Sequence, residues 1–246
     1  MAGRGLMAMV FVLFCSLVQA GEATTPSVIH LASEDWEDYT ATDGRGLGWD
    51  VLRQVFEPAG VKVDIRTEPY VRSMGLAERG EVDACVGSYS KESEDVLYPR
   101  WNFDTDHIYA LGLASSPVPT LETLGLYRLA WIRGYDYQNY LPNVRRYDEV
   151  IRRTGIVSML THNRADFYID AQTEVDYVFN RAKDPSQLRR THIAELPLYL
   201  CFAKTDKART LMALFDQRMD QLVKSGELKP IFERWKQPYP FDDPQM

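Results

Sequence analysis

The order of apolar and polar residues along the first third of the chain predicts alternating strands and helices. Segments 27–33, 61–67 and 82–87 are short apolar or alternating runs, which are typical of strands. Between them, segments 46–60 and 70–80 repeat their apolar residues every three or four positions, as amphipathic helices do. This order predicts right-handed crossovers and a parallel sheet covered on both faces.

Each predicted helix has one apolar face and a glycine at its end. Gly60 and Gly80 follow the last turns, where glycine commonly ends a helix. The faces that we expect to be buried contain Trp49, Leu52, Val55 and Phe56 in the first helix, and Val71, Met74 and Ala77 in the second.

A second α/β unit follows. Segments 128–134, 166–170 and 196–204 are predicted strands, and a short helix precedes the first of them. No long linker separates the two units, so short connections should join them. Apolar residues at helical spacing are Met159 and Leu160, then Val175, Val178 and Phe179, and finally Leu211, Leu214, Phe215, Met219 and Leu222 followed by Leu228, Ile231, Phe232 and Trp235.

The amino terminus has the pattern of a secretory signal peptide. Arg4 precedes the apolar run 6–18, which is shorter than the about 20 residues that span a bilayer as a helix. Small residues then favour cleavage after Ala20, with Ala23 as the alternative. We therefore expect residues 1–20 to be removed and the protein to be secreted.

Composition excludes some partners. The chain has 246 residues, 45% of them hydrophobic, and a formal net charge of −7. Removal of residues 1–20 takes away Arg4 and no acidic residue, so the remainder is one unit more negative. Such a chain repels nucleic acid and anionic lipid. Its length allows one or two domains with a sizeable core.

Cysteines and histidines predict no further chemistry. Cys85 and Cys201 would remain after cleavage; one disulfide is an option in an oxidising compartment, but each lies in an apolar stretch and we expect two free, buried thiols. No spacing places two histidines on one helical face, so no metal site is predicted. The histidines are His30, His107, His162 and His192.

Aromatic and charged residues gather in the loops that follow the predicted strands. Open parallel sheets bind ligands beyond the carboxyl ends of their strands, so two lobes of this kind should enclose a cleft lined by these loops. Aromatic faces beside carboxylates suit a small amine or cation. The candidate ligand-binding residues are Trp36, Tyr39, Tyr70, Arg72, Ser88, Tyr89, Glu92, Tyr135 and Asp170, with Tyr137 beside them.

Several motifs in this order resemble the bacterial periplasmic solute-binding proteins of the polar amino-acid type (extracellular solute-binding protein family three), which serve ABC importers. The resemblance extends from about Val28 to Trp235. Its motifs are Gly48, Trp49 and Asp50 at the first long helix, Gly80, Asp83 and Ala84 before and in the third strand, segment 163–170, and Ser225, Gly226, Ile231 and Trp235 in the closing helices.

The resemblance implies an α/β, two-lobed periplasmic-binding-protein fold (type II) that closes on its ligand by hinge motion. Lobe 1 would comprise residues 24–108, lobe 2 residues 109–200, and residues 201–246 would form helices that return to lobe 1. The crossings are expected near residues 106–110 and 197–204. It also implies a monomer without cofactor or enzymatic activity, whose small polar ligand passes to an ABC permease.

One loop departs from the family pattern. Typical members carry Thr-x-x-Arg after the third strand, and the arginine binds the ligand's α-carboxylate; residues 90–93 here are Ser, Lys, Glu and Ser. Asp170 matches the aspartate that binds the α-amino group. We therefore expect Glu92 and Asp170 to favour a cationic ligand, and Glu94 and Asp95 to form a solvated helix start.

Two other readings stay open. Arg72 could supply an anion contact from another direction, or pair with Glu68 or Glu78 at the surface.

The same scaffold could serve a ligand sensor that acts on a separate membrane partner, or a dehydratase-like enzyme, although a dehydratase would need a cationic clamp beyond Arg72.

Overall fold

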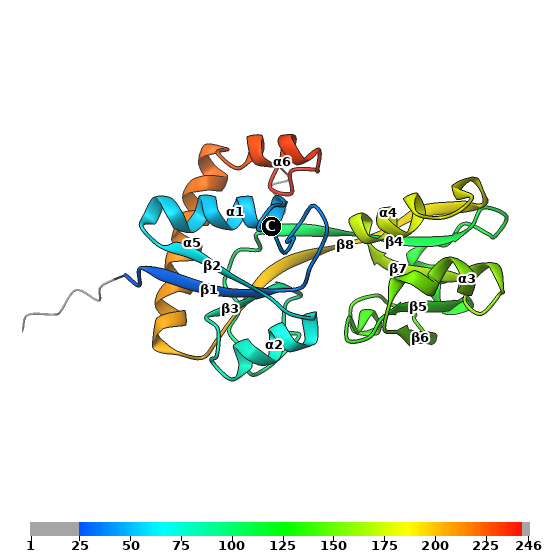
Figure 1. The fold of residues 1–246 in the computed structure, drawn as a ribbon, viewed down its shortest axis with the longest axis horizontal. Coiled ribbons are helices and arrows are strands. Elements are labelled where there is room, and N and C mark those ends of the chain that lie inside the picture. Colours follow the sequence, from blue (N-terminus) through cyan, green and yellow to red (C-terminus); the bar gives the residue numbers. More distant parts are fainter. Residues whose placement is uncertain (1–24, 243–246) are drawn as a thin grey trace, which may run out of the picture.

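The computed structural model describes residues 25–242, so the predicted signal peptide and its cleavage sites at Ala20 and Ala23 lie outside the described residues. Eight strands form one sheet in the order β2-β1-β3-β8-β4-β7-β5-β6. The sheet is divided between two lobes, and β4 and β8 run from one to the other (Figure 1). The predicted α/β, two-lobed fold is therefore confirmed.

Lobe 1 has helices on both faces of a mostly parallel sheet, as its pattern predicts. β1 pairs in parallel with β2 and β3, and β3 pairs antiparallel with the end of β8. The strands are β1 (Val28–Ser33), β2 (Lys62–Thr67) and β3 (Ala84–Ser88), and the helices are α1 (Leu47–Phe56), η1 (Glu57–Ala59), α2 (Tyr70–Glu78), α5 (Asp206–Ser225) and α6 (Lys229–Trp235).

Lobe 2 continues the sheet beyond β4. β7 pairs antiparallel with β4 and in parallel with β5, and β6 is the edge strand. The strands are β4 (Asp104–Leu113), β5 (Arg128–Ile132), β6 (Arg146–Val150), β7 (Phe167–Ala171) and β8 (Leu188–Phe202), and the helices are η2 (Leu121–Leu126), η3 (Tyr137–Asn139), η4 (Arg153–Gly155), α3 (Ile156–Thr161), α4 (Gln172–Asn180) and η5 (Pro185–Gln187).

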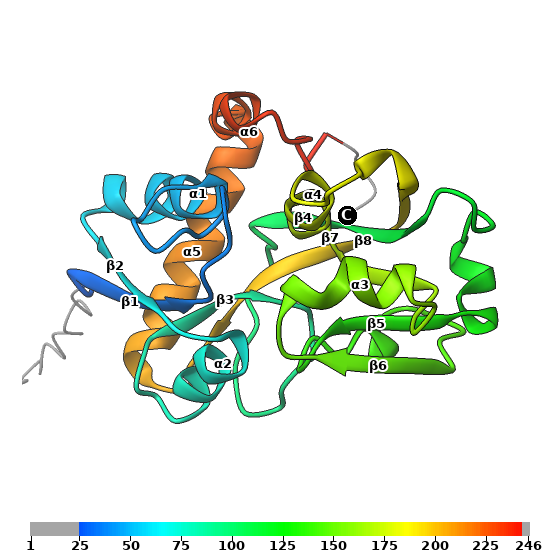
Figure 2. The same cartoon turned by 45° about the vertical axis from the view of Figure 1, so that its right-hand side comes forward.

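One large hydrophobic cluster extends along the sheet through both lobes, and each lobe has a smaller cluster as well. In lobe 1, Phe56 of α1 and Phe215 of α5 meet on one face, with ring centroids 6.1 Å apart, while α2 covers the other face with Met74 and Ala77. In lobe 2, α3 and α4 cover one face of the sheet (Figure 2). With the sheet covered by helices, the loops after the strands line the space between the lobes.

One predicted face residue is not buried. Val71 was expected on the buried face of α2, but it is 59% exposed. The buried face of α2 consists of Ser73, Met74, Leu76 and Ala77. Val71 lies instead on the side of the helix that approaches lobe 2, where a Cβ on Gly134 would be 2.4 Å from its Cγ2 atom.

The expectation of two free thiols is wrong. Cys85 and Cys201 form a disulfide and are both fully buried. They lie directly opposite each other on the antiparallel strands β3 and β8, with Cα atoms 5.0 Å apart, a normal separation for a disulfide. The sequence shows two apolar strands but not that these strands are neighbours, so the pairing was not readable from it.

Candidate ligand-binding cleft

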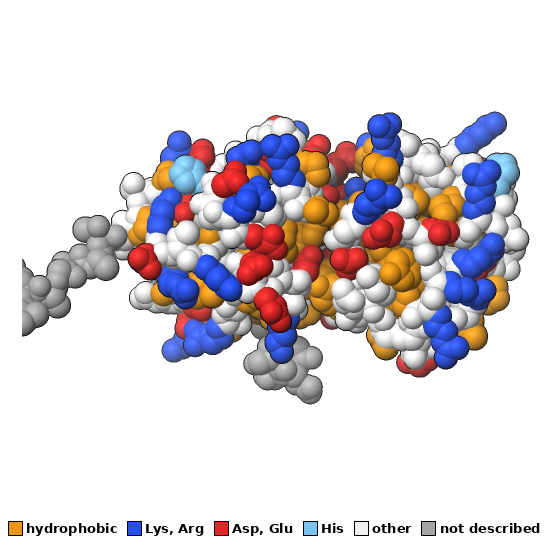
Figure 3. Space-filling view, turned by 90° about the horizontal axis from the view of Figure 1, so that it is seen from below, with side chains coloured by type: hydrophobic (Ala, Val, Ile, Leu, Met, Phe, Trp, Pro, Cys, Tyr) orange, Lys and Arg blue, Asp and Glu red, His pale blue; other side chains and the backbone are white. Residues whose placement is uncertain are grey.

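A cavity of about 30 Å³ lies between the lobes, with room for about two water molecules. Acidic and hydrophobic side chains flank the boundary between the lobes on the face shown in Figure 3. Five of the lining residues are acidic, and no Lys, Arg or His is among them. The lining residues are Glu34, Trp36, Tyr70, Gly87, Tyr89, Glu92, Asp106, Tyr135, Tyr137, Asp170, Ala171 and Glu174.

The ends of four strands position most of these side chains. Glu34 directly follows β1, Tyr89 directly follows β3 and Tyr135 follows β5 after a short turn. Asp170 is the penultimate residue of β7. The cavity therefore lies where the carboxyl ends of the strands face each other across the two lobes, as open α/β sheets predict.

The loop after β3 brings Glu92 into the cavity. One carboxylate oxygen of Glu92, Oε2, accepts hydrogen bonds from the Tyr70 hydroxyl at 2.6 Å, the Ser88 hydroxyl at 2.9 Å and the Tyr89 backbone N–H at 3.1 Å. Three donors on one oxygen hold the side chain in place and leave the other oxygen available. Burial raises the pKa of Glu92, and these hydrogen bonds oppose the rise.

The other acidic residues of that loop point elsewhere. Glu94 and Asp95 are exposed, as expected for solvated residues, but they lie in turns and not at the start of a helix. Lys204 reaches both, donating to the Glu94 backbone carbonyl at 2.5 Å and lying 4.0 Å from the Asp95 carboxylate. Within this loop, Glu92 is the acidic residue that belongs to the cavity.

Two further carboxylates in the cavity are hydrogen-bonded only to tyrosine. The Tyr135 hydroxyl donates to Glu34 at 2.8 Å, and the Tyr89 hydroxyl donates to Asp106 at 2.8 Å. Burial raises the pKa of Glu34 to about 7, while Arg153 and the Tyr135 hydrogen bond lower it. Burial, with neighbouring carboxylates, raises the pKa of Asp106 to about 8.

On the lobe 2 side an arginine balances the charge. The Nε atom of Arg153, in η4, lies 3.1 Å from Asp170 and 2.9 Å from Glu174. Arg153 also donates from Nη2 to the Tyr135 hydroxyl at 2.7 Å, and Tyr168 donates to Asp170. Although burial acts to lower the pKa of Arg153, Asp170 raises it, so the guanidinium stays charged. Burial raises the pKa of Glu174 against the charge of Arg153.

Six of the nine candidate residues line the cavity: Trp36, Tyr70, Tyr89, Glu92, Tyr135 and Asp170. Ser88 is buried, and its hydroxyl donates a hydrogen bond to the Glu92 carboxylate. Tyr39 lies at an adjacent small cavity, where its hydroxyl donates to Asp104 at 2.7 Å. Arg72 lies outside the cavity; its side chain is 62% exposed and 3.2 Å from Glu68.

Sequence reasoning missed four charged residues of this site: Glu34, Asp106, Arg153 and Glu174. Glu34 directly follows a predicted strand, so its position in the chain was a usable signal. Asp106 was placed only as part of a crossing, and Arg153 and Glu174 are on helices whose orientation the sequence does not reveal. Their meeting depends on how the two lobes face each other.

The lobes touch across the cleft in this structure. Trp36 of lobe 1 donates its indole N–H to the Thr173 hydroxyl of lobe 2 at 2.6 Å, and Glu37 lies 3.3 Å from Arg181. The Tyr70 and Tyr135 rings are in edge contact, with centroids 6.0 Å apart. This closed arrangement leaves too little space for a molecule of amino-acid size, so a ligand of that size requires the lobes to part.

No protein-family model and no curated protein sequence matches the chain. Solved structures share its fold. A histidine kinase sensor domain with similarity to periplasmic binding proteins has a TM-score of 0.68 and 19% identity, covering 86% of this chain and 96% of that one. The substrate-binding protein of an amino-acid ABC transporter has a TM-score of 0.64 and 16% identity, covering 85% and 98%.

A third similar structure is an ancestral amino-acid-binding protein, a precursor of cyclohexadienyl dehydratase, with a TM-score of 0.64, 15% identity and coverage of 85% and 95%. The chain thus has the ligand-binding fold of the periplasmic binding proteins, and the resemblance to the amino-acid type is confirmed for the fold. Among residues 25–242, no helix is long and apolar enough to span a bilayer.

Proposed function

We propose that this protein is a periplasmic solute-binding protein that captures a small cationic, amine-bearing ligand and delivers it to an ABC-type importer. The observation that carries the proposal is the charge of the cavity: five carboxylates and no cation among its lining residues. A ligand carboxylate would find no free cation among the lining residues and would be repelled by those carboxylates that are ionised, whereas an ammonium group would be attracted to the carboxylates and to the aromatic faces.

The candidate residues divide into two roles. Glu34, Glu92 and Asp106 supply carboxylate oxygens to ammonium groups, and Trp36, Tyr70, Tyr89 and Tyr135 supply aromatic faces and hydroxyls. Asp170 lines the cavity, but Arg153 already occupies its carboxylate. Arg153 is not free for a ligand carboxylate, because Asp170, Glu174 and the Tyr135 hydroxyl already surround it. Opening and closing of the lobes about β4 and β8 admits and then encloses the ligand.

Proteins that share this fold are not all components of importers. A similar structure is a sensor domain and another is a dehydratase precursor. The cavity disfavours a dehydratase on carboxylic acids, because its lining residues include no cationic clamp for the substrate. A sensor would bind the same class of ligand, so transport and sensing differ in the membrane partner and not in the cleft.

A thermal-shift screen of the purified protein tests the ligand class. Polyamines, quaternary amines, α-amino acids and small carboxylates are compared, since a ligand at a hundredfold its Kd stabilises a protein by about 2.7 kcal/mol. We expect cations without a carboxylate to raise the melting temperature most. Glu92→Gln should remove this effect, and Glu94→Gln, an exposed change in the same loop, should leave it intact.

The proposal fails if small dicarboxylates or neutral α-amino acids stabilise the protein most. It also fails if Glu92→Gln, while folding normally, responds to the cations as the wild type does. Uptake of a labelled cation by cells that depend on this protein then separates delivery from sensing: a sensor would bind the cation without supporting its uptake.

A further inference from the structure

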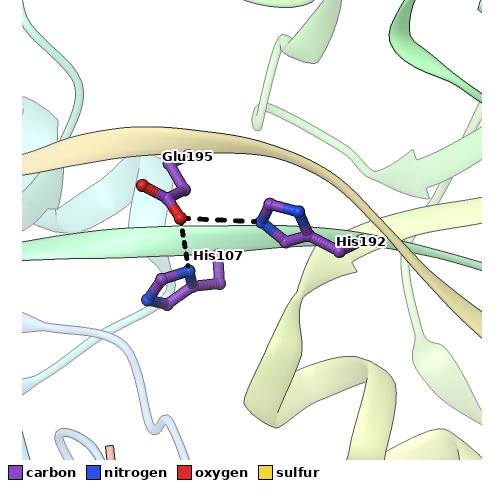
Figure 4. Close-up of side chains that lie close together, drawn as sticks. All are labelled: His107, His192 and Glu195. Carbon is purple, nitrogen blue, oxygen red and sulfur yellow. Dashed lines mark ion pairs between the residues drawn. The ribbon is translucent and has the colours of Figure 1, made fainter. Parts of the chain in front are cut away.

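Two histidines and a glutamate meet on the strands that join the lobes. His107 is on β4, and His192 and Glu195 are on β8 (Figure 4). The Nδ1 atom of His107 is 3.4 Å from Oε1 of Glu195, and the Nε2 atom of His192 is 4.0 Å from the same oxygen. One ligand atom from each residue lies within 4.8 Å of the others. The sequence predicted no metal site because no two histidines are spaced to share a helical face. That argument does not apply to His107 and His192, which meet across two strands.

An irregularity in β8 aims these side chains at one another. His107 is opposite Glu195 and Ile108 is opposite Ala194, but Tyr109 is opposite His192, so Ile193 is an extra residue in β8. Residues three apart on a regular strand point to opposite faces. The bulge at Ile193 brings His192 and Glu195 to the same face, and bulges commonly redirect side chains in this way.

The cluster lies at the junction of the lobes. β7 pairs with β4 only from Ile108 onwards, and β3 pairs with β8 only from Tyr199 onwards. His107 and Glu195 therefore lie in the part of the sheet where β4 and β8 pair only with each other. On β4, His107 directly follows Asp106, but His107, His192 and Glu195 are not among the residues that line the acidic cavity.

We propose that His107, His192 and Glu195 bind one divalent transition-metal ion such as Zn²⁺. Two imidazole nitrogens and a carboxylate oxygen are a ligand set that zinc accepts, with water in the fourth position. Tetrahedral bonds of about 2.0–2.2 Å place ligand atoms roughly 3.3–3.6 Å apart, so small side-chain rotations complete the geometry. Mg²⁺ and Ca²⁺ prefer all-oxygen sites and are not expected to bind.

Solvent access allows an ion to enter. The side chain of His107 is 19% exposed, that of His192 is 42% and that of Glu195 is 58%. An ion bound here would link the two strands through side chains, in addition to their backbone hydrogen bonds, at the point where the lobes hinge. The site is separate from the acidic cavity, so this proposal stands or falls independently of the proposed ligand.

Calorimetry on metal-free protein tests the site, with ZnCl₂ and MgCl₂ titrated separately in a buffer that does not bind metals. We expect one equivalent of Zn²⁺ and no heat from Mg²⁺. His107→Gln and His192→Gln should each weaken Zn²⁺ binding by more than about tenfold, because even the loss of a supporting hydrogen-bond partner costs about 10–100-fold. His162→Gln removes an exposed histidine elsewhere and should bind like the wild type.

Circular dichroism without metal checks that each variant folds. If a histidine variant fails to fold, Glu195→Gln is tested instead, because Glu195 is the most exposed of the three residues. Co²⁺ supplies an optical readout: visible absorption bands of a bound ion should appear with the wild type and His162→Gln but not with the His107→Gln/His192→Gln double variant. The proposal is overturned if the wild type takes up no Zn²⁺ at millimolar concentration, or if the two histidine variants bind Zn²⁺ as tightly as the wild type.

Discussion

The two walls of the cleft carry the same residue type in different electrostatic settings. On the lobe 1 side, Glu34 and Glu92 are hydrogen-bonded to neutral hydroxyl and backbone N–H donors. On the lobe 2 side, Asp170 and Glu174 share the guanidinium of Arg153. The carboxylates of Glu34 and Glu92 have no cation in direct contact, whereas those of Asp170 and Glu174 do.

This difference assigns separate tasks to the walls. The Arg153 group fixes the shape of the lobe 2 wall, while the lobe 1 wall and Asp106 provide negative charge that a ligand can neutralise. Burial holds the pKa of Glu34 at about 7 and that of Asp106 at about 8. A cation that enters the cavity stabilises the ionised forms of both groups, so binding and ionisation are coupled.

The largest expected effect is on stability and comes from the lobe 2 wall. Arg153→Met leaves Asp170 and Glu174 buried without a cation, and removing one partner of a buried ion pair typically costs about 3–5 kcal/mol. Urea unfolding measures the loss. Arg152→Met, at the exposed neighbouring position, should change the free energy of unfolding by less than about 0.5 kcal/mol. Equal midpoints for the two variants would contradict the role assigned to Arg153.

The next largest effect is a difference in ligand affinity between variants of the two walls. Glu34→Gln removes a charge that faces the ligand, and should weaken binding of a cation by about 1.5–3 kcal/mol, the usual contribution of a hydrogen bond to a charged group. Glu174→Gln removes a charge that Arg153 already balances, so a smaller loss is expected. Calorimetric titration of both variants with one polyamine measures the difference. Equal losses would mean that the walls do not differ.

The pH dependence of affinity tests the unbalanced charge directly. Because the pKa values of Glu34 and Asp106 are about 7 and about 8, both groups are largely protonated at pH 6 and both are largely ionised only above about pH 9. Affinity for a permanent cation should therefore rise with pH across this window, by up to about tenfold per pH unit for each proton released. A quaternary amine is the suitable probe, since its own charge does not change. An affinity that is flat with pH would contradict the coupling.

The smallest effect is expected outside the cavity. Arg72 is largely exposed and pairs with Glu68 on the surface of α2. Arg72→Gln should change ligand affinity by less than about 0.5 kcal/mol, because exposed ion pairs contribute little. A loss of tenfold or more in the same titration would place Arg72 at the ligand after all.

The sequence predicted the parts of the fold that local pattern controls. The apolar runs and helical faces led to β1, α1, β2, α2 and β3 in lobe 1 and to the closing helices. The edge strand β6 was missed, because its residues are exposed and show no alternation. β4 was expected only as a crossing near residues 106–110, and β8 extends well before the predicted segment 196–204.

For the site, the sequence identified side chains in loops but not their partners. Glu92 was singled out because it lies in the loop that lacks the arginine expected from the resemblance, but its three hydrogen-bond donors could not be foreseen. The same limit applies to the disulfide between Cys85 and Cys201 and to the meeting of His107 with His192. Each depends on which strands are neighbours, and that information is absent from the local order of residues.

The most direct test of the account compares two ligands that differ only in a carboxylate. Arginine and its decarboxylated form, agmatine, have the same guanidinium and amine, and each is titrated into the wild-type protein at pH 8. An anionic cavity without a free cation predicts that agmatine binds more tightly by at least about tenfold, or 1.4 kcal/mol. If arginine binds as tightly as agmatine or more tightly, the cleft recognises a carboxylate and the central claim is wrong.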